Sequence, residues 1–302
     1  MTRGKILVIR GGAIRDFILT LPVLAALRQQ FPQAHLEVLG YPHIVPLAQV
    51  GGLVDRVQAI EARGLASFFA RKGELPEELR DYFSEFNIIV SYLYDPDGIF
   101  QENVQRCSPG QIIVGRHQPD EAERVHATQV YLKPLERLAI FDADTVPRLT
   151  LEPQSSTRNP VLALHPGSGS EHKNWPEQKW AELINQLLGM TDLNLLLVGG
   201  EAEGNRLQKL AAALPPTRTS VARNLPLTEL ARRLQTCVGF VGHDSGITHL
   251  AAAVGLPCVV LWAHTMVEIW RPQGERVQIL QDTSGLSELS VARVMTALQP
   301  LL

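Results

Sequence analysis

VLALHPGSGSEHKNWPEQKWAELINQLLGMTDLNLLLVGG, residues Val161 to Gly200, holds a strand, a loop, a helix and a second strand in direct succession. The apolar runs at its two ends predict buried strands, and the stretch from Pro176 to Leu188 predicts the helix between them. A strand, a crossing helix and a second strand form the unit from which parallel sheets are built. This stretch therefore predicts an α/β fold.

The same order of elements continues toward the C-terminus. Glu201 to Leu214 predicts a helix. CVGFVGHD (Cys237 to Asp244) and LPCVVLWA (Leu256 to Ala263) predict strands on either side of a helix of small residues, and a closing helix is predicted near Leu286 to Leu298. The second half of the chain thus predicts one doubly wound domain.

The first half of the chain follows the same pattern. KILVIR (Lys5 to Arg10) predicts a strand, and apolar residues at helical spacing from Phe17 to Leu27 predict the helix after it. Further apolar runs predict strands at His35 to Gly40, Asn87 to Tyr92 and Ile112 to Gly115. A second doubly wound domain is therefore expected.

A polar stretch with two prolines, LEPQSSTRNP (Leu151 to Pro160), separates the two halves and is typical of a linker. We therefore predict an N-terminal Rossmann-like domain over residues 1–155 and a C-terminal one over residues 156–302. Ligands of open α/β sheets bind outside the carboxyl ends of the strands, so two such domains facing each other predict a central cleft.

The composition limits the classes of function. The chain has 302 residues, 45% of them hydrophobic and 20% charged, as in ordinary soluble globular proteins. A net charge of -3 argues against a general nucleic-acid binder, so a site for an anion must be local.

The three cysteines form no CxxC pair and predict buried thiols in a reducing compartment. The apolar run before Arg10 is too short for a signal peptide, which predicts a cytoplasmic protein, with contact at the inner membrane face left open.

HPGSGSEHKNWP (His165 to Pro176) lies between a predicted strand and a predicted helix. Backbone N–H groups of a Gly/Ser loop and a helix N-terminus form a site for anions, and Lys173 adds a positive charge. An ordinary turn with a solvated lysine is the alternative. The loop is neither a Walker A motif nor a GxGxxG motif, so it indicates a phosphate without naming its carrier.

VGHDSGITHLAAAVGLP (Val241 to Pro257) predicts a second anion site, because Asp244 and Ser245 end a strand and Gly246 begins a helix. Asp244 as a helix cap, worth about 1 kcal/mol, is the alternative interpretation. We interpret His249, one helical turn beyond Gly246, as a packing residue rather than a catalyst.

VIRGGAIRDFILTLP (Val8 to Pro22) places Asp16 at the start of the first helix, next to the carboxyl end of the first strand. A carboxylate there can act as a general base toward a hydroxyl group, or it can simply cap the helix. Gly12 gives the loop room, and Arg10 and Arg15 can meet acidic groups of a ligand.

Two DxD strings, Asp95-Pro96-Asp97 and Asp142-Ala143-Asp144, raise the question of a metal ion. Both lie in the N-terminal half, away from the phosphate loops, and turns explain both. Helix dipoles and Lys173 can stabilise an anionic leaving group without a cation. We therefore predict no metal and no cofactor.

Together these segments resemble glycosyltransferase family 9, the ADP-heptose:lipopolysaccharide heptosyltransferases. The resemblance covers nearly the whole chain and is carried by ILVIRGGAIRDFILTLPVLAAL, LALHPGSGSEHKNWP, LLLVGGEAE and GHDSGITHLAAAVGLP. It implies a GT-B fold in which the N-terminal domain binds the acceptor and the C-terminal domain binds the sugar nucleotide.

The resemblance also implies a role for single residues. Asp16 matches the catalytic base, Lys173 a lysine that contacts the donor diphosphate, and Glu201 an acidic residue at the ribose. The predicted donor-binding residues are Ser168, Gly169, Ser170, Lys173, Glu201, Asp244, Ser245, Gly246 and Thr248, and the predicted acceptor-binding residues are Gly12, Arg10 and Arg15.

Two segments depart from the family pattern. Arg15 stands where the family usually has glycine before the base, and WAHT (Trp262 to Thr265) stands where FGPT is typical. His264 is interpreted as an exposed loop residue, with a contact to the donor as the alternative. These departures imply altered sugar specificity or, alternatively, lost activity.

The resulting expectation is an inverting, metal-independent glycosyltransferase. By resemblance, its donor is a nucleotide-diphosphate sugar, with ADP-heptose favoured, and its acceptor is a lipopolysaccharide-core or related glycan or glycolipid. An altered homologue that binds a sugar nucleotide or glycan without transfer is the alternative, and a nucleotide-sugar epimerase or hydrolase is a further rival.

Overall fold

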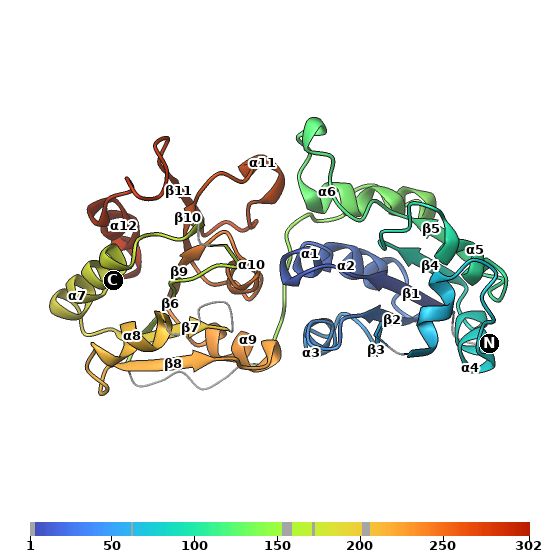
Figure 1. Ribbon diagram of the computed structural model, residues 1–302, viewed down its shortest axis with the longest axis horizontal. Helices are drawn as coiled ribbons and strands as arrows, with labels where there is room; N and C mark the ends of the chain where they lie inside the picture. Colours follow the sequence, from blue (N-terminus) through green and yellow to red (C-terminus); the bar gives the residue numbers. More distant parts are fainter. Residues whose placement is uncertain (1–3, 62, 153–158, 171–172, 201–205) are drawn as a thin grey trace. The chain divides into compact units, whose positions relative to one another are not determined.

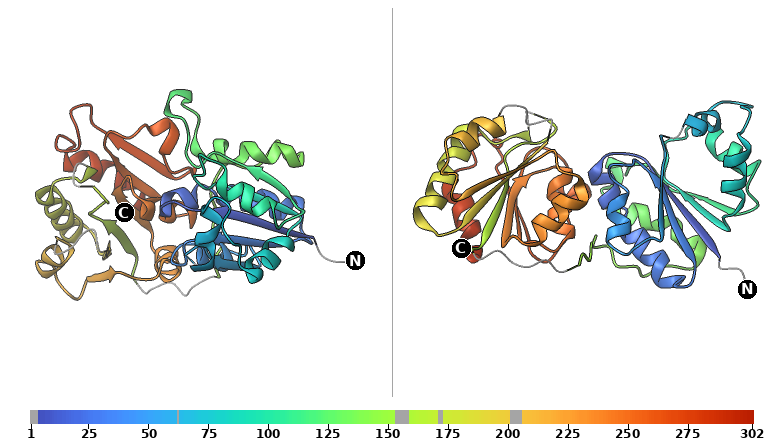
Figure 2. Two further views of the ribbon diagram at one scale, coloured as in Figure 1. Left: turned by 45° about the vertical axis from the view of Figure 1, so that its right-hand side comes forward. Right: turned by 90° about the horizontal axis from the view of Figure 1, so that it is seen from below.

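The computed structural model describes residues 4–61, 63–152, 159–170, 173–200 and 206–302. They belong to two compact units, Met1–Leu149 and Thr150–Leu302, each built from a parallel sheet with helices (Figures 1 and 2). The division falls just before the polar stretch from Leu151 to Pro160, of which residues 153–158 lie outside the described part of the chain. The predicted α/β architecture with two doubly wound sheets is confirmed.

The N-terminal unit has a five-stranded sheet in the order β3-β2-β1-β4-β5. Every strand pairs with its neighbours in parallel. The strands are β1 (Lys5–Arg10), β2 (His35–Gly40), β3 (Arg56–Ala59), β4 (Ile88–Ser91) and β5 (Gln111–Val114).

The helix predicted after β1 is two helices in the structure, because Pro22 lies in the first turn of the second one. Proline has no N–H to donate to the preceding turn, and it suits a helix start. The helices of this unit are α1 (Ile14–Ile18), α2 (Leu21–Gln30), α3 (Pro46–Val50), α4 (Glu77–Ser84), α5 (Ile99–Gln105) and α6 (Ala127–Leu132), with 3₁₀ segments at Arg63–Phe69 (η1), Glu121–Glu123 (η2) and Lys133–Leu138 (η3).

The core beneath α4, α5 and η1 is largely aromatic. Phe83 is fully buried, with its ring centroid 4.9 Å from that of Phe68 and 6.2 Å from that of Phe100. Alternate residues of β1, Leu7 and Ile9, supply the sheet side of this core. These contacts fix α5 against the sheet.

The C-terminal unit has a six-stranded parallel sheet in the order β11-β10-β9-β6-β7-β8. The strands are β6 (Val161–His165), β7 (Asn194–Gly199), β8 (Thr219–Arg223), β9 (Gly239–His243), β10 (Cys258–Trp262) and β11 (Val277–Gln281). The helices are α7 (Glu177–Met190), α8 (Arg206–Ala212), α9 (Leu227–Gln235), α10 (Gly246–Ala253), α11 (Val267–Trp270) and α12 (Val291–Leu298), followed by a 3₁₀ turn at Gln299–Leu301.

The closing helix is shorter than predicted, because Ser290 caps α12 by accepting the N–H of Arg293. Leu286 and Leu289, at the start of the predicted helix, precede it and are buried in the core. In that core α12 packs against α7, whereas α10 packs against α9.

The strand order determines which loops lie where α/β proteins bind their ligands. In each sheet the order reverses beside the first strand of the unit, between β1 and β4 and between β6 and β9. Such a reversal leaves a crevice outside the carboxyl ends of the two strands, where α/β proteins bind ligands. The segments after β1, β6 and β9 therefore lie at the positions of the fold best suited to a site.

Two of the three cysteines are buried, as predicted. Cys237 precedes β9 and Cys258 begins β10, and burial raises the pKa of the Cys237 thiol to about 12. Cys107, beyond the end of α5, is only partly buried, and burial raises its pKa as well. All three are free thiols.

No helix in the described ranges is both long enough and apolar enough to span a membrane.

Candidate active site

The loop after β6 is shaped by hydrogen bonds of its own. Ser168 Oγ lies 2.8 Å from both the carbonyl of Ser170 and Oδ1 of Asn174, and it accepts the N–H of Ser170 at 3.3 Å. The N–H of Lys173 donates to the Ser170 carbonyl at 3.1 Å. Space around Gly169 is open, since an added Cβ would meet no atom of the described residues within 4 Å. The backbone at Gly169 is thus accessible to a ligand, while the Ser168 hydroxyl is engaged within the loop.

Lys173 is held by Asp244, which follows the end of β9. Its Nζ lies 2.8 Å from Oδ2 of Asp244, and Thr265 Oγ1 donates to the same oxygen at 2.7 Å. The Asp244 side chain is 1% exposed and that of Lys173 is 32% exposed. The carboxylate is therefore buried, while the Lys173 side chain stays partly open to solvent.

The cap of α10 is Ser245, so the interpretation of Asp244 as a helix cap is wrong. Ser245 Oγ accepts the N–H of Thr248 at 3.3 Å and lies 3.3 Å from Nδ1 of His165. Thr248 is fully buried and its hydroxyl donates to the carbonyl of His243. The Thr248 side chain thus ties the start of α10 to the end of β9. Gly246 is the first residue of α10.

The WAHT segment after β10, which departs from the family pattern at Trp262, Ala263 and His264, holds a structural tryptophan and brings Thr265 to the site. Trp262 is fully buried, and its indole N–H donates to the carbonyl of Thr265 at 2.6 Å. This bond turns the segment so that the Thr265 hydroxyl reaches Asp244. Sequence reasoning missed Thr265, although its place after a strand that neighbours β9 is a signal for it. His264 is exposed, as expected.

Glu201, predicted to meet the ribose of the donor, lies outside the described residues. It stays a prediction.

In the N-terminal unit, Asp16 lies in the first turn of α1 with one oxygen engaged. Its Oδ2 accepts the N–H of Ala13 at 3.0 Å. Its Oδ1 is buried and has no hydrogen-bond partner in the described part of the chain, with Nε of Arg15 3.9 Å away. Asp16 therefore caps the helix and still keeps an oxygen that can take a proton.

Gly12 makes room for this carboxylate. Its φ is +91°, a backbone conformation that suits glycine, and a Cβ added there would lie 2.8 Å from Oδ2 of Asp16. A larger residue would displace the carboxylate.

Arg10, at the end of β1, is 2% exposed and points into the unit. Its Nη1 donates to the carbonyls of His117 at 2.9 Å and Tyr92 at 3.3 Å, and Nε and Nη2 lie 3.4 Å from the carbonyl of Asp16. Its Cζ lies 4.5 Å from the ring centroid of Tyr131. These contacts favour a positioning role for Arg10.

The two phenols beside Arg10 stay neutral. Burial raises the pKa of Tyr92 and of Tyr131 above the usual range, although the nearby guanidinium acts in the opposite direction. Tyr92 can therefore donate to the carbonyl of Tyr131, which fixes α6 beside β4.

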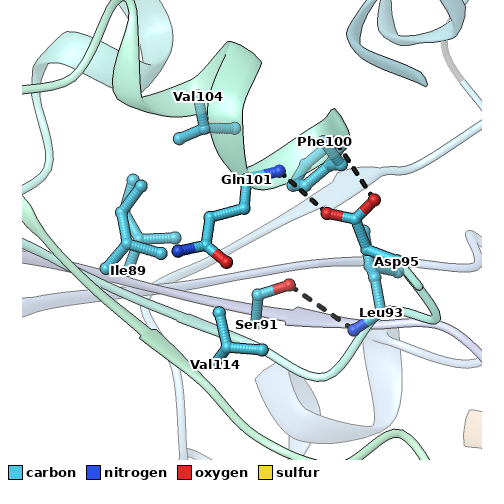
Figure 3. Close-up of a pocket in the computed structure, with 9 residues that line it drawn as sticks. Ile89, Ser91, Leu93, Asp95, Phe100, Gln101, Val104 and Val114 are labelled. Carbon is cyan, nitrogen blue, oxygen red and sulfur yellow. Dashed lines mark hydrogen bonds between the residues drawn. The ribbon is translucent and has the colours of Figure 1, made fainter. Parts of the chain in front are cut away.

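In each DxD string one aspartate, Asp95 or Asp144, accepts backbone N–H groups of the residues that follow it and so stabilises a turn. Asp95 accepts the N–H groups of Phe100 at 3.2 Å and Gln101 at 2.9 Å, which begins α5 (Figure 3). Asp144 accepts the N–H of Val146 and pairs with Arg148. Within the described ranges, no three His, Cys, Asp or Glu side chains gather as a metal site would require.

A small pocket with a cavity volume of about 20 Å³ lies between α5 and the strands β4 and β5. Figure 3 shows the amide of Gln101 pointing into it beside Ser91 and Ile89. Sequence reasoning did not foresee this pocket.

The two parallel sheets, each with its crevice at a strand reversal, are those of the GT-B glycosyltransferases. Over 99% of its length this chain superposes on the glycosyl transferase family 9 structure from Veillonella parvula, covering 97% of that chain with a TM-score of 0.80 and 17% identity. It superposes equally far on Escherichia coli heptosyltransferase WaaC with ADP, covering all of that chain with a TM-score of 0.77 and 20% identity.

Sequence comparison adds the family. Residues 125–295, more than half of the chain, match the model of glycosyltransferase family 9 (heptosyltransferase). Lipopolysaccharide heptosyltransferase 3 of Escherichia coli K12 is 24% identical over 289 residues, which cover 87% of this chain and 83% of that protein. The chain belongs to glycosyltransferase family 9, and it is a glycosyltransferase.

We expect Gly12→Ala to impair transfer beyond its effect on stability. Gly52, with φ +68° and no atom within 4 Å of an added Cβ, is the matched control. A positive φ costs alanine roughly 1–2 kcal/mol at either position, as measured by denaturant unfolding. Only Gly12→Ala also pushes on Asp16, so only this variant should lose transfer rate. Equal rates in the two variants would contradict the role given to Gly12.

Proposed function

We propose that the protein transfers a sugar, with inversion and without a metal ion, from a nucleotide-diphosphate sugar to a glycan acceptor. The observation that carries this proposal is Lys173, whose side chain is partly exposed and whose ammonium group a buried carboxylate holds beside the start of α10. This arrangement suits a diphosphate, which carries charge where the ammonium and the helix N-terminus are positive.

The leaving diphosphate would be stabilised by fixed groups of the C-terminal unit. Asp244 orients Lys173, and Thr265 orients Asp244. The open backbone at Gly169 and the first N–H groups of α10 complete the donor site. Groups that are already in place need no rearrangement when charge develops on the leaving group, which is the main source of electrostatic catalysis.

Asp16 would act as the general base. An acceptor hydroxyl loses its proton to Oδ1 and attacks the anomeric carbon from the side opposite the leaving group, so that the configuration inverts. Arg10 holds the carbonyl of Asp16 and so fixes the start of α1. The partly exposed side chain of Arg15 is then better placed than Arg10 to meet an acidic acceptor.

ADP-heptose is the favoured donor and a lipopolysaccharide-core or related glycolipid the favoured acceptor. Support comes from relatives, since WaaC was solved with ADP and with ADP-2-deoxy-2-fluoro heptose, and the K12 relative is a lipopolysaccharide heptosyltransferase. We place the reaction in the cytoplasm, with the enzyme meeting a lipid-linked acceptor at the inner membrane face.

A homologue that binds the donor without transfer is the second candidate, and Arg15 is the observation behind it. Its Nε lies 3.9 Å from the oxygen proposed to accept the proton. A guanidinium there can pair with that oxygen and so compete with an acceptor hydroxyl for it. The segment after β10 gives this alternative no support, because Thr265 still reaches Asp244.

Asp16→Asn should lower the transfer rate by roughly two to four orders of magnitude, because an amide cannot take the proton. Donor affinity should stay unchanged. Asp95→Asn, the same change at a helix start in the same unit, serves as the control and should keep the rate. Transfer at the normal rate by Asp16→Asn would remove the assignment of the base.

Calorimetric titration with ADP, UDP and GDP, with and without EDTA, tests the donor site. We expect ADP to bind most tightly, with an affinity that EDTA leaves unchanged. Lys173→Ala should weaken ADP binding by roughly ten- to a hundredfold, since it removes a charge-assisted contact. Arg232→Ala removes an exposed charge of α9 and should have no effect. This proposal would be overturned if ADP binding required a metal ion or if Lys173→Ala left the affinity for ADP unchanged.

A further inference from the structure

His243, the last residue of β9, is fully buried beneath the loop that carries Lys173. Side chains alternate along a strand, so His243 shares the face of Val241, which packs in the core beneath α7. Its ring lies edge to face with Trp180 of α7, with centroids 5.5 Å apart. This residue does not belong to the donor-binding set predicted from the sequence.

Both ring nitrogens of His243 bind the backbone of the loop. Nε2 accepts the N–H of Trp175 at 2.8 Å, and Nδ1 lies 3.2 Å from the carbonyl of Gly167. Because an amide N–H only donates, Nε2 must present its lone pair, and the ring proton is on Nδ1, where it donates to the carbonyl. A neutral imidazole in this tautomer satisfies both backbone groups.

The two bonds enclose the residues of the donor loop. Gly167 comes just before Ser168, and Trp175 comes two residues after Lys173. Trp175 is itself anchored, since its indole N–H donates to the carbonyl of Leu289 at 2.9 Å. One imidazole therefore fixes the beginning and the end of the loop.

We infer that His243 is a positioning residue for the donor diphosphate, an inference that rests on the proposed function. His243 holds the loop through its backbone, and the next residue, Asp244, holds it through the ammonium of Lys173. The end of β9 thus sets the positions of Gly167 and Trp175 and the place of the Lys173 charge between them. A loop whose two ends are fixed before binding loses less conformational freedom when the ligand arrives.

His243→Leu tests this role, because leucine fills the core and offers no hydrogen bond. We expect the affinity for ADP, measured by calorimetry, to fall about tenfold. In the transfer assay, kcat/KM for the donor should fall by a similar factor, because the loop carries groups that stabilise the leaving diphosphate. His243→Gln places an amide oxygen near the position of Nε2, so it should recover most of the affinity.

Hydrogen exchange gives a readout that needs no nucleotide. Peptides that cover residues 166–176 should exchange faster in His243→Leu than in the wild-type protein. Val241→Ala, a buried change on the same face of β9, is the control for lost stability. Well below its unfolding midpoint it should change neither the exchange of the loop nor ADP affinity.

The outcomes separate this inference from the proposed function. Faster loop exchange together with weaker ADP binding in His243→Leu, recovered in His243→Gln, supports it. Unchanged exchange, or faster exchange with unchanged affinity, overturns it. A wild-type protein that binds no nucleoside diphosphate overturns the proposed function and the role at the donor with it, while the exchange experiment still decides whether His243 holds the loop.

Discussion

The C-terminal unit depends on the burial of one carboxylate, that of Asp244. A charge with 1% of its side chain exposed costs several kcal/mol in lost hydration unless partners compensate for it. Lys173 supplies the opposite charge and Thr265 a hydroxyl donor. The segments after β6 and β10 therefore converge on the end of β9, and that convergence forms the proposed donor site.

The N-terminal unit has a comparable arrangement with the sign reversed. A buried guanidinium, that of Arg10, stands at the end of β1 and is compensated by backbone carbonyls rather than by a carboxylate. Its donors bring together the ends of β1, β4 and β5 and the first turn of α1. In both units a buried charge at the end of a central strand orders the surrounding loops, and one of these segments carries the residue proposed to act in the reaction, Lys173 or Asp16.

Hydrophobic patterning predicted the central strands because they are buried on both faces. It missed edge strands such as β3 and β8, which contain polar as well as apolar residues and are partly exposed. At the site, spacing could place Lys173 and Asp244 after strands, but it could not tell which of Asp244 and Ser245 caps α10. Nor could it show that Arg10 points inward, because the direction of a long side chain depends on carbonyls distant in sequence. The role of Asp16 remains a prediction.

The alternation along β9 ties strand pairing to chemistry. His165 of β6 is opposite Gly242, and Leu261 of β10 is opposite His243. A slip of one residue in this register would bring Asp244 to the face that packs on Trp180 and turn His243 away from the loop. Such a misfolded sheet could keep its strands and helices and still lack the anion site. Because a carboxylate is unfavourable in this tryptophan-lined core, the core disfavours the slipped register and selects the one that the proposed donor site requires.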